Sequence, residues 1–218
     1  MKFFKHLFWV CVAIGGFTSC NDEPTVSFYP SIGVYQVSGD SSYIYSDNLN
    51  LIYITNSTFE GKETLDSGAR VYAYFSLVED EQMPRHIDYM ADLLSIDIIP
   101  TKPVINITDT VPDSLGFDPI VVEGIKVGLN FLDVSIEFLG FNKKHYVNLV
   151  RLSDEYSDTI DLELRHNNNN DPKIDRYTAY ISFDISSLEN EATDSVIVRF
   201  RSTAYDDSIF EKIFTYKY

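Results

Sequence analysis

The stretch LDVSIEF, residues 132–138, alternates strictly between apolar and polar side chains. Successive side chains of a β-strand point to opposite faces, so this alternation is typical of a strand with one face on a core. The members expected to face the core are Leu132, Val134, Ile136 and Phe138. Those expected to face water are Asp133, Ser135 and Glu137. The stretch therefore predicts a half-buried strand.

Similar runs follow one another through the second half of the chain, separated by polar turns. They cover residues 119–128, 130–138, 144–151, 158–166, 176–185, 194–202 and 209–217. Seven short antiparallel strands within about 100 residues are typical of an immunoglobulin-like sandwich. We therefore expect a C-terminal β-sandwich.

The first half contains shorter runs rich in β-branched and aromatic residues, at 31–37, 42–46, 50–55, 69–79 and 85–98. Five strands in a segment of this length suit a small closed barrel. The last run changes phase around ADLLSI, residues 91–96, as a strand does at a bulge. The fold class expected for the whole chain is all-β, with a small OB-like barrel before the sandwich.

A proline-rich segment, residues 100–119, separates the halves and contains four of the eight prolines. Proline has no N–H to donate to a sheet, so the segment indicates a linker with at most a short strand. We place the domain boundary near residue 110, which gives a barrel domain at 31–110 and a sandwich domain at 111–218.

The N-terminus has the order of a lipoprotein signal. Lys2 and Lys5 precede an apolar run at residues 7–17, which is too short to span a bilayer. The following FTSC, residues 17–20, resembles a lipobox that is cleaved before a lipidated cysteine. We expect a signal peptide at 1–19 and a tether at 20–30, with the membrane contacted through lipid on Cys20.

Charge and motifs limit the function classes. The formal net charge is −16 and no basic cluster is present, which disfavours nucleic acid as a partner. The nucleophile elbow, zinc-protease, P-loop and dinucleotide motifs are all missing, so we expect no enzyme, cofactor or metal site. The acidic pair Asp22 and Glu23 after the lipobox resembles a surface-export cue of some Gram-negative bacteria. The expected location is the outer membrane of the cell envelope, with exposure at the surface.

Polar residues gather in RHNNNNDP, residues 165–172. Asparagine tolerates left-handed backbone, so the stretch is typical of a turn that ends a strand. A weak calcium site and a ligand-recognition loop stay open as alternatives, although the loop has one carboxylate and lacks EF-hand spacing. The candidate ligand-binding residues here are His166, Asn167, Asn168 and Asp171. His145 and His166 would meet if their strands are neighbours.

Tyrosines give the first domain a second candidate surface. In RVYAYFSL, residues 70–77, Tyr72 and Tyr74 share one face, and Val71, Ala73 and Phe75 share the other. Exposed aromatic rings suit a protein interface or stacking on a sugar. The alternative is that the tyrosines fill the ends of the barrel.

Several segments resemble the NigD-like protein family. The second half matches through SLGFDPIVVEGIKVGLNFLDVSIEFLG, KKHYVNLV, LELRHNNNNDP, YISFDISSL and KIFTYKY, and the first through RVYAYFSLVED and IDYMADLLSIDIIPTKPV. The resemblance implies an OB-type barrel, a C-terminal sandwich and a lipoprotein, and it brings no catalytic residues. It also implies an immunity-type role, because the family is named for a member encoded beside a bacteriocin. We expect a non-enzymatic lipid-anchored protein that binds a protein ligand such as a bacteriocin; the alternative is a surface glycan-binding accessory lipoprotein.

Overall fold

The computed structural model describes residues 27–56, 59, 65–79, 84–107, 115–152 and 159–218. Within these ranges the chain forms a closed barrel and two further sheets, which confirms the predicted all-β class. The strands of the barrel are β1 (Phe28–Ser38), β2 (Ser41–Ser46), β3 (Leu51–Ile54), β4 (Arg70–Val78) and β5 (Tyr89–Ile98). The other strands are β6 (Thr101–Pro103), β7 (Ile105–Asn106), β8 (Val121–Gly128), β9 (Phe131–Gly140), β10 (Tyr146–Arg151), β11 (Thr159–Asn167), β12 (Asp175–Asp184), β13 (Ser195–Thr203) and β14 (Ile209–Lys217).

The barrel closes in the order β1-β2-β3-β5-β4, and β4 returns to pair with β1. All of these pairs are antiparallel except β3 with β5, which is parallel. Inward side chains from every strand fill the interior, including Tyr35, Ile44, Ile52, Ala73 and Leu93. The predicted phase change is confirmed, because the register of β4 with β5 shifts between Tyr74 and Phe75, opposite Leu94.

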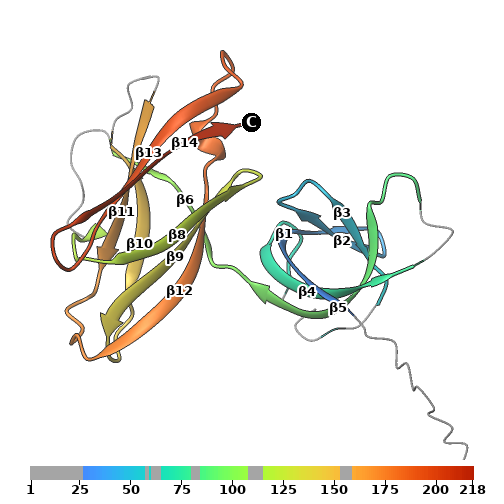
Figure 1. Ribbon diagram of the computed structural model, residues 1–218, viewed down its shortest axis with the longest axis horizontal. Coiled ribbons are helices and arrows are strands. Elements are labelled where there is room, and N and C mark those ends of the chain that lie inside the picture. Colours follow the sequence, from blue (N-terminus) through green and yellow to red (C-terminus); the bar gives the residue numbers. More distant parts are fainter. Residues whose placement is uncertain (1–26, 57–58, 60–64, 80–83, 108–114, 153–158) are drawn as a thin grey trace, which may run out of the picture.

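The second domain is a sandwich of two sheets (Figure 1), with strand orders β14-β13-β11-β10-β7 and β6-β12-β9-β8. The proline-rich segment supplies an edge strand to each sheet, since β6 pairs with β12 and β7 pairs with β10, both in parallel. Because of this pairing, we propose that the sandwich domain begins at Thr101.

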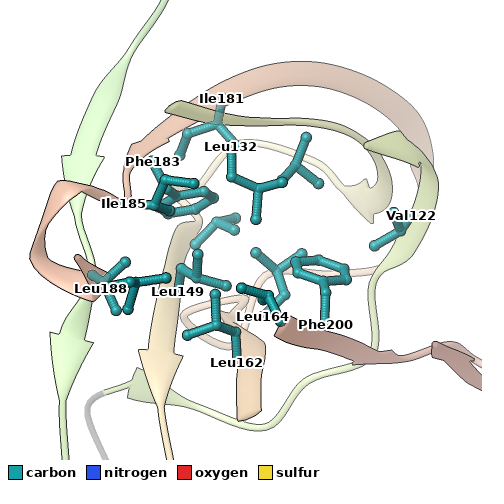
Figure 2. Packing of buried hydrophobic residues seen from close by; sticks show 14 of the residues in the cluster. Val122, Leu132, Leu149, Leu162, Leu164, Ile181, Phe183, Ile185, Leu188 and Phe200 are labelled. Carbon is teal, nitrogen blue, oxygen red and sulfur yellow. The ribbon is translucent and has the colours of Figure 1, made fainter. Parts of the chain in front are cut away.

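Aliphatic and aromatic side chains of both sheets meet between the two layers (Figure 2). Leu132 and Phe183 come from β9 and β12 of one sheet, and Ile185 directly follows β12. Leu162 and Phe200 come from β11 and β13 of the facing sheet. The exposed fraction of each of these five residues is at most 1%. Removal of apolar surface from water at this interface is the main stabilising contribution to the domain.

Candidate functional site

Tyr72 and Tyr74 lie on the outer face of β4, with exposed fractions of 40% and 38%. The register of β1 with β4 places Ile32 opposite Tyr72 and Pro30 opposite Tyr74. The two rings therefore stand side by side on the surface, next to apolar neighbours on the adjacent strand. We refer to Tyr72 and Tyr74 as the tyrosine face; its ligand-binding role stays a prediction.

The candidate residues of the asparagine-rich stretch come together in the sandwich, away from the tyrosine face. β10 and β11 pair so that Val147 lies opposite His166, and His145 just before β10 reaches across. His145 Nδ1 lies 2.9 Å from His166 Nε2, so the predicted meeting of these histidines is confirmed. Asn169 and Asn170 have φ values of 54° and 52°, the left-handed conformation expected of a turn here.

Asp171 holds the turn that follows β9. Its carboxylate accepts N–H bonds from Phe141 at 2.5 Å, Asn142 at 3.2 Å and Lys143 at 3.1 Å, and lies 3.2 Å from His145 Nε2. Burial alone would raise the pKa of Asp171, but the backbone N–H donors and His145 outweigh it and hold this pKa below its ordinary value. Asp171 therefore acts as an ionised cap within the fold.

The histidines and Asp171 form one hydrogen-bonded chain that ends at a carbonyl, because His166 Nδ1 lies 3.1 Å from Pro119 O. The carbonyl and the carboxylate only accept, so the three links need three N–H protons. Two neutral imidazoles carry only two. Protonation of both rings would set N–H against N–H at the link between them.

We expect stability to fall as the pH drops below about 6.5, the usual histidine value. Burial lowers the pKa of His166 and the charge of His145 adds to this, so the unfolded chain binds a proton that the folded chain does not. The loss of stability grows again below about pH 3.9, because Asp171 binds a proton in the unfolded chain at a higher pH than in the folded chain. Urea unfolding between pH 7 and pH 5 measures the slope.

His166→Asn should flatten this slope, whereas His86→Asn, at an exposed site in the barrel domain, should leave it unchanged. Equal slopes for His166→Asn and the unmodified chain would show that the buried pair does not cause the acid sensitivity.

Gly116 packs against the same corner and has a φ of +70°. A Cβ there would lie 2.5 Å from His166 O and 2.7 Å from Asn167 Cα. Gly116→Ala should therefore destabilise the chain by more than the roughly 1–2 kcal/mol of left-handed strain alone. Gly39→Ala is the control. Gly39 has a φ of +60° but no atom within 4 Å of an added Cβ, so this variant measures the backbone strain alone. Equal unfolding free energies for the two variants would contradict the close approach.

A cavity of about 250 Å³ opens beside this corner, between the rings of Phe138, Phe141 and Tyr177. Its polar groups are already engaged, since Lys143 Nζ donates to the carbonyls of Asn169 and Asn170. The amide side chains also stabilise the turn, because the side-chain oxygens of Asn167 and Asn168 accept hydrogen bonds from the N–H groups of Asn169 and Asn170, respectively. The observed bonds of the corner are structural, and a ligand-binding role for it stays a prediction.

Among the residues that the structure describes, no group of three or more His, Cys, Asp or Glu side chains is arranged to hold a metal ion. In the same ranges no helix is long and apolar enough to cross a membrane. Cys20, the expected lipidation site, lies outside the described residues.

A buried ion cluster joins the two domains, and sequence reasoning missed it. Arg70 contacts Asp47 through Nη1 at 2.5 Å and Asp133 through Nη2 at 2.6 Å. The exposed fractions of these side chains are 0% for Arg70, 3% for Asp47 and 0% for Asp133. Lys126, half exposed, adds a contact to Asp47 at 3.0 Å. We refer to Arg70, Asp47 and Asp133 as the interdomain triad.

The expectation that Asp133 faces water is wrong. It points away from the sandwich core, as the alternation predicts, but the barrel covers that outer face. The β8–β9 hairpin reaches toward the barrel (Figure 1), and Gly128 lies so close to Asp47 that an added Cβ would overlap its carboxylate. The alternation of a strand specifies a face and does not show what covers it.

Hydrogen bonds within the triad favour the charged form of Arg70. Burial alone would lower the pKa of Arg70, but its hydrogen bonds to Asp47 and Asp133 outweigh burial and raise this pKa. Nearby Tyr180 has its pKa raised to about 12 by burial and by the charge of Asp133. The available signal in the sequence was a pair of opposite charges at outward positions, Arg70 in the barrel domain and Asp133 in the sandwich domain. Such charges identify an ion pair only when the arrangement of the two domains is known.

Comparison with known proteins places the chain in a family. Residues 103–216 match the family model of the NigD-like C-terminal beta sandwich domain. No curated protein matches the chain.

Solved structures share the fold over both domains. A protein of unknown function from Bacteroides vulgatus is 19% identical with a TM-score of 0.72, covering 88% of this chain and 92% of its own. A NigD-like immunity protein from Bacteroides caccae is 18% identical, with a TM-score of 0.64 and coverages of 89% and 98%. A predicted lipoprotein from Bacteroides fragilis is 14% identical, with a TM-score of 0.60 and coverages of 88% and 98%. At these identities the likeness shows the fold alone, whereas the family model matches more than half of the residues, and the chain therefore belongs to the NigD-like family.

Proposed function

We propose that this chain is a non-enzymatic, lipid-anchored protein of the cell envelope that binds a protein ligand of the toxin class in an immunity-type role. The observation that carries the proposal is the tyrosine face, where Tyr72 and Tyr74 stand exposed on a closed barrel. Tyrosine is enriched in protein interfaces because it contributes a large apolar ring and a polar tip at a small cost in conformational entropy.

The surroundings of the tyrosine face suit a protein partner. β4 is held on both sides, by β1 and by β5, so the two rings project from a rigid surface. Ser95 lies opposite Tyr74 and Asp97 opposite Tyr72 on β5, which gives the apolar centre a polar border. An apolar centre with a polar rim is the usual anatomy of an interface.

The anchor belongs to the same proposal. The order of basic residues, apolar run and FTSC supports lipidation at Cys20, and the acidic pair Asp22 and Glu23 supports a location at the outer membrane, exposed at the surface. The fold shared with a predicted lipoprotein from Bacteroides fragilis and with a NigD-like immunity protein from Bacteroides caccae is consistent with this role. A receptor held at the membrane would meet a toxin before it enters the cell.

The direct test uses the chain from residue 20 with Cys20→Ser, and a bacteriocin purified from spent medium by its killing activity. Saturable binding is expected, and Tyr72→Ala with Tyr74→Ala should weaken it by at least about 100-fold, as for two interface hot spots. Tyr146→Ala, an exposed tyrosine of the sandwich at 42%, is the matched control and should bind normally. Binding that is identical in all variants would remove the tyrosine face from the proposal.

The alternative, a glycan-binding accessory lipoprotein, rests on the same two rings, because exposed aromatic side chains also stack on sugars. It predicts retention on a host polysaccharide column that the double tyrosine variant loses. No retention on such columns, together with saturable binding of a bacteriocin, would leave the protein ligand as the function of this face.

A further inference from the structure

A cavity of about 210 Å³ opens at one end of the barrel, separate from the tyrosine face. Here β1 enters, β2 ends, β3 begins, β4 ends and β5 begins. Its lining residues are Tyr29, Pro30, Ser31, Ser46, Asn48, Asn50, Ile52, Phe75, Leu77 and Tyr89. All ten are uncharged, in a chain whose net charge is −16. We refer to this cavity as the barrel mouth.

Two tyrosine rings flank the mouth. Tyr29 and Tyr89 are each 43% exposed, so both keep open ring faces. Tyr29 is stacked on Phe75 of the interior, with ring centroids 6.4 Å apart and planes inclined by 28°. Tyr89 is held by the parallel pairing of β5 with β3, in which it lies opposite Ile52. The rings are therefore supported from beneath by the barrel.

The β2–β3 turn brings two amide side chains to the same opening. Within the described residues, the side-chain amides of Asn48 and Asn50 have no hydrogen-bond partner. The backbone around them is fixed: Ser46 N donates to Asn50 O at 2.9 Å, and Asn50 N donates to Ser46 Oγ at 3.2 Å. The free amides thus sit on a rigid turn.

The interdomain triad fixes this turn from its other side. Asp47 is the first residue after β2, and it is bound by Arg70 and Lys126. Its N–H also donates to Ile32 O at 3.0 Å. A further hydrogen bond holds the other end of the turn, where Leu51 N donates to Asp88 Oδ2 at 2.7 Å. The backbone that carries the two amides is therefore preorganised, which reduces the entropy lost when a ligand binds.

We propose that the barrel mouth binds one uncharged sugar ring. Aromatic faces pack against the C–H face of a pyranose, and carboxamides donate to and accept from its hydroxyl groups. Drug-sized ligands fill cavities of about 300–1,000 Å³, so this smaller mouth suits a single ring. The uncharged lining offers no ion-pair partner to a carboxylate or an ammonium group. The sugar site is independent of the protein-binding role proposed for the tyrosine face.

The test titrates the chain from residue 20, with Cys20→Ser, with methyl glycosides of glucose, galactose, mannose and N-acetylglucosamine, using saturation-transfer NMR. At least one should bind saturably, with a dissociation constant on the order of 1 mM, as expected for so small a ligand. Glucuronic acid and glucosamine, the charged analogues, should bind more weakly than their neutral counterparts.

Variants locate the site. Tyr89→Ala should weaken glycoside binding about tenfold, as the loss of one ring contact implies, and Asn50→Asp should weaken it by removing the N–H donors at constant size. Tyr146→Ala and the double variant of Tyr72 and Tyr74 should bind the glycoside normally, which keeps this result distinct from that of the tyrosine face. No saturable binding in the panel, or undiminished binding by Tyr89→Ala and Asn50→Asp, would overturn the proposal.

Discussion

Arg70→Ala is expected to lower the free energy of unfolding by about 3–5 kcal/mol, as measured by urea denaturation. The guanidinium is the central cation between Asp47 and Asp133, and all three side chains are buried at the domain interface. Removing it leaves two carboxylates facing each other with little access to water. Lys126, at 49% exposed, forms an ion pair with Asp47, and among the described residues it forms none with Asp133, which lies opposite it on β9.

Arg176→Ala is the matched control. This arginine also makes an ion pair, with Glu137 at 2.6 Å, but its side chain is 68% exposed. Exposed pairs contribute about 0–1 kcal/mol, so the control should be nearly neutral. If Arg70→Ala cost no more than Arg176→Ala, the triad would not hold the domains together.

A triple variant distinguishes two contributions to the free energy of unfolding. One is the cost of leaving buried carboxylates without a partner, and the other is the net contribution of the intact triad. Arg70→Met with Asp47→Leu and Asp133→Leu replaces the charges by apolar groups and leaves no carboxylate unpaired. Such replacements are often neutral or stabilising. We expect the triple variant to recover most of the stability that Arg70→Ala loses, and a further loss would indicate that the domain contact needs the charges.

Phe200→Ala is expected to destabilise the sandwich by about 3–5 kcal/mol. Phe200 lies in β13, fully buried, between the layers shown in Figure 2. It lies opposite Leu162 in the β11–β13 pairing and meets Phe210 edge to face, with ring centroids 6.1 Å apart. The variant loses both the transfer of the ring from water and the contacts around the cavity that remains.

Ile209→Ala provides the comparison for Phe200→Ala. Ile209 begins the neighbouring strand β14 but is 66% exposed, so its truncation should change stability by no more than about 0.5 kcal/mol. Unfolding curves followed by circular dichroism measure both variants. A similar small effect for the two would mean that the interior of the sandwich is not packed as described.

The strands were predictable because their signal is local. Predicted runs such as 209–217 and 42–46 agree with β14 and β2 to within a residue, since alternation and turn residues mark where a strand starts and ends. The short strands β6 and β7 were harder to predict. They are edge strands of the proline-rich segment, and their pairing partners lie about 45 to 80 residues away along the chain.

The sites were predictable only in part. Neighbouring strands bring His145 to His166, which their separation in sequence permits but does not require. The placement of Arg70 against Asp133 depends on how two complete domains dock, and no local pattern encodes that. The barrel mouth was missed for a related reason, because its residues come from all five strands or the turns beside them.

Survival of a deletion strain challenged with bacteriocins from competing bacteria tests the central claim most directly. The proposal predicts that the strain lacking this protein is killed at lower bacteriocin concentrations than its parent. The full-length chain and Tyr146→Ala should restore resistance, whereas the double variant Tyr72→Ala with Tyr74→Ala should not. Identical killing curves for the deletion strain and its parent, across the bacteriocins of its competitors, would contradict the immunity role.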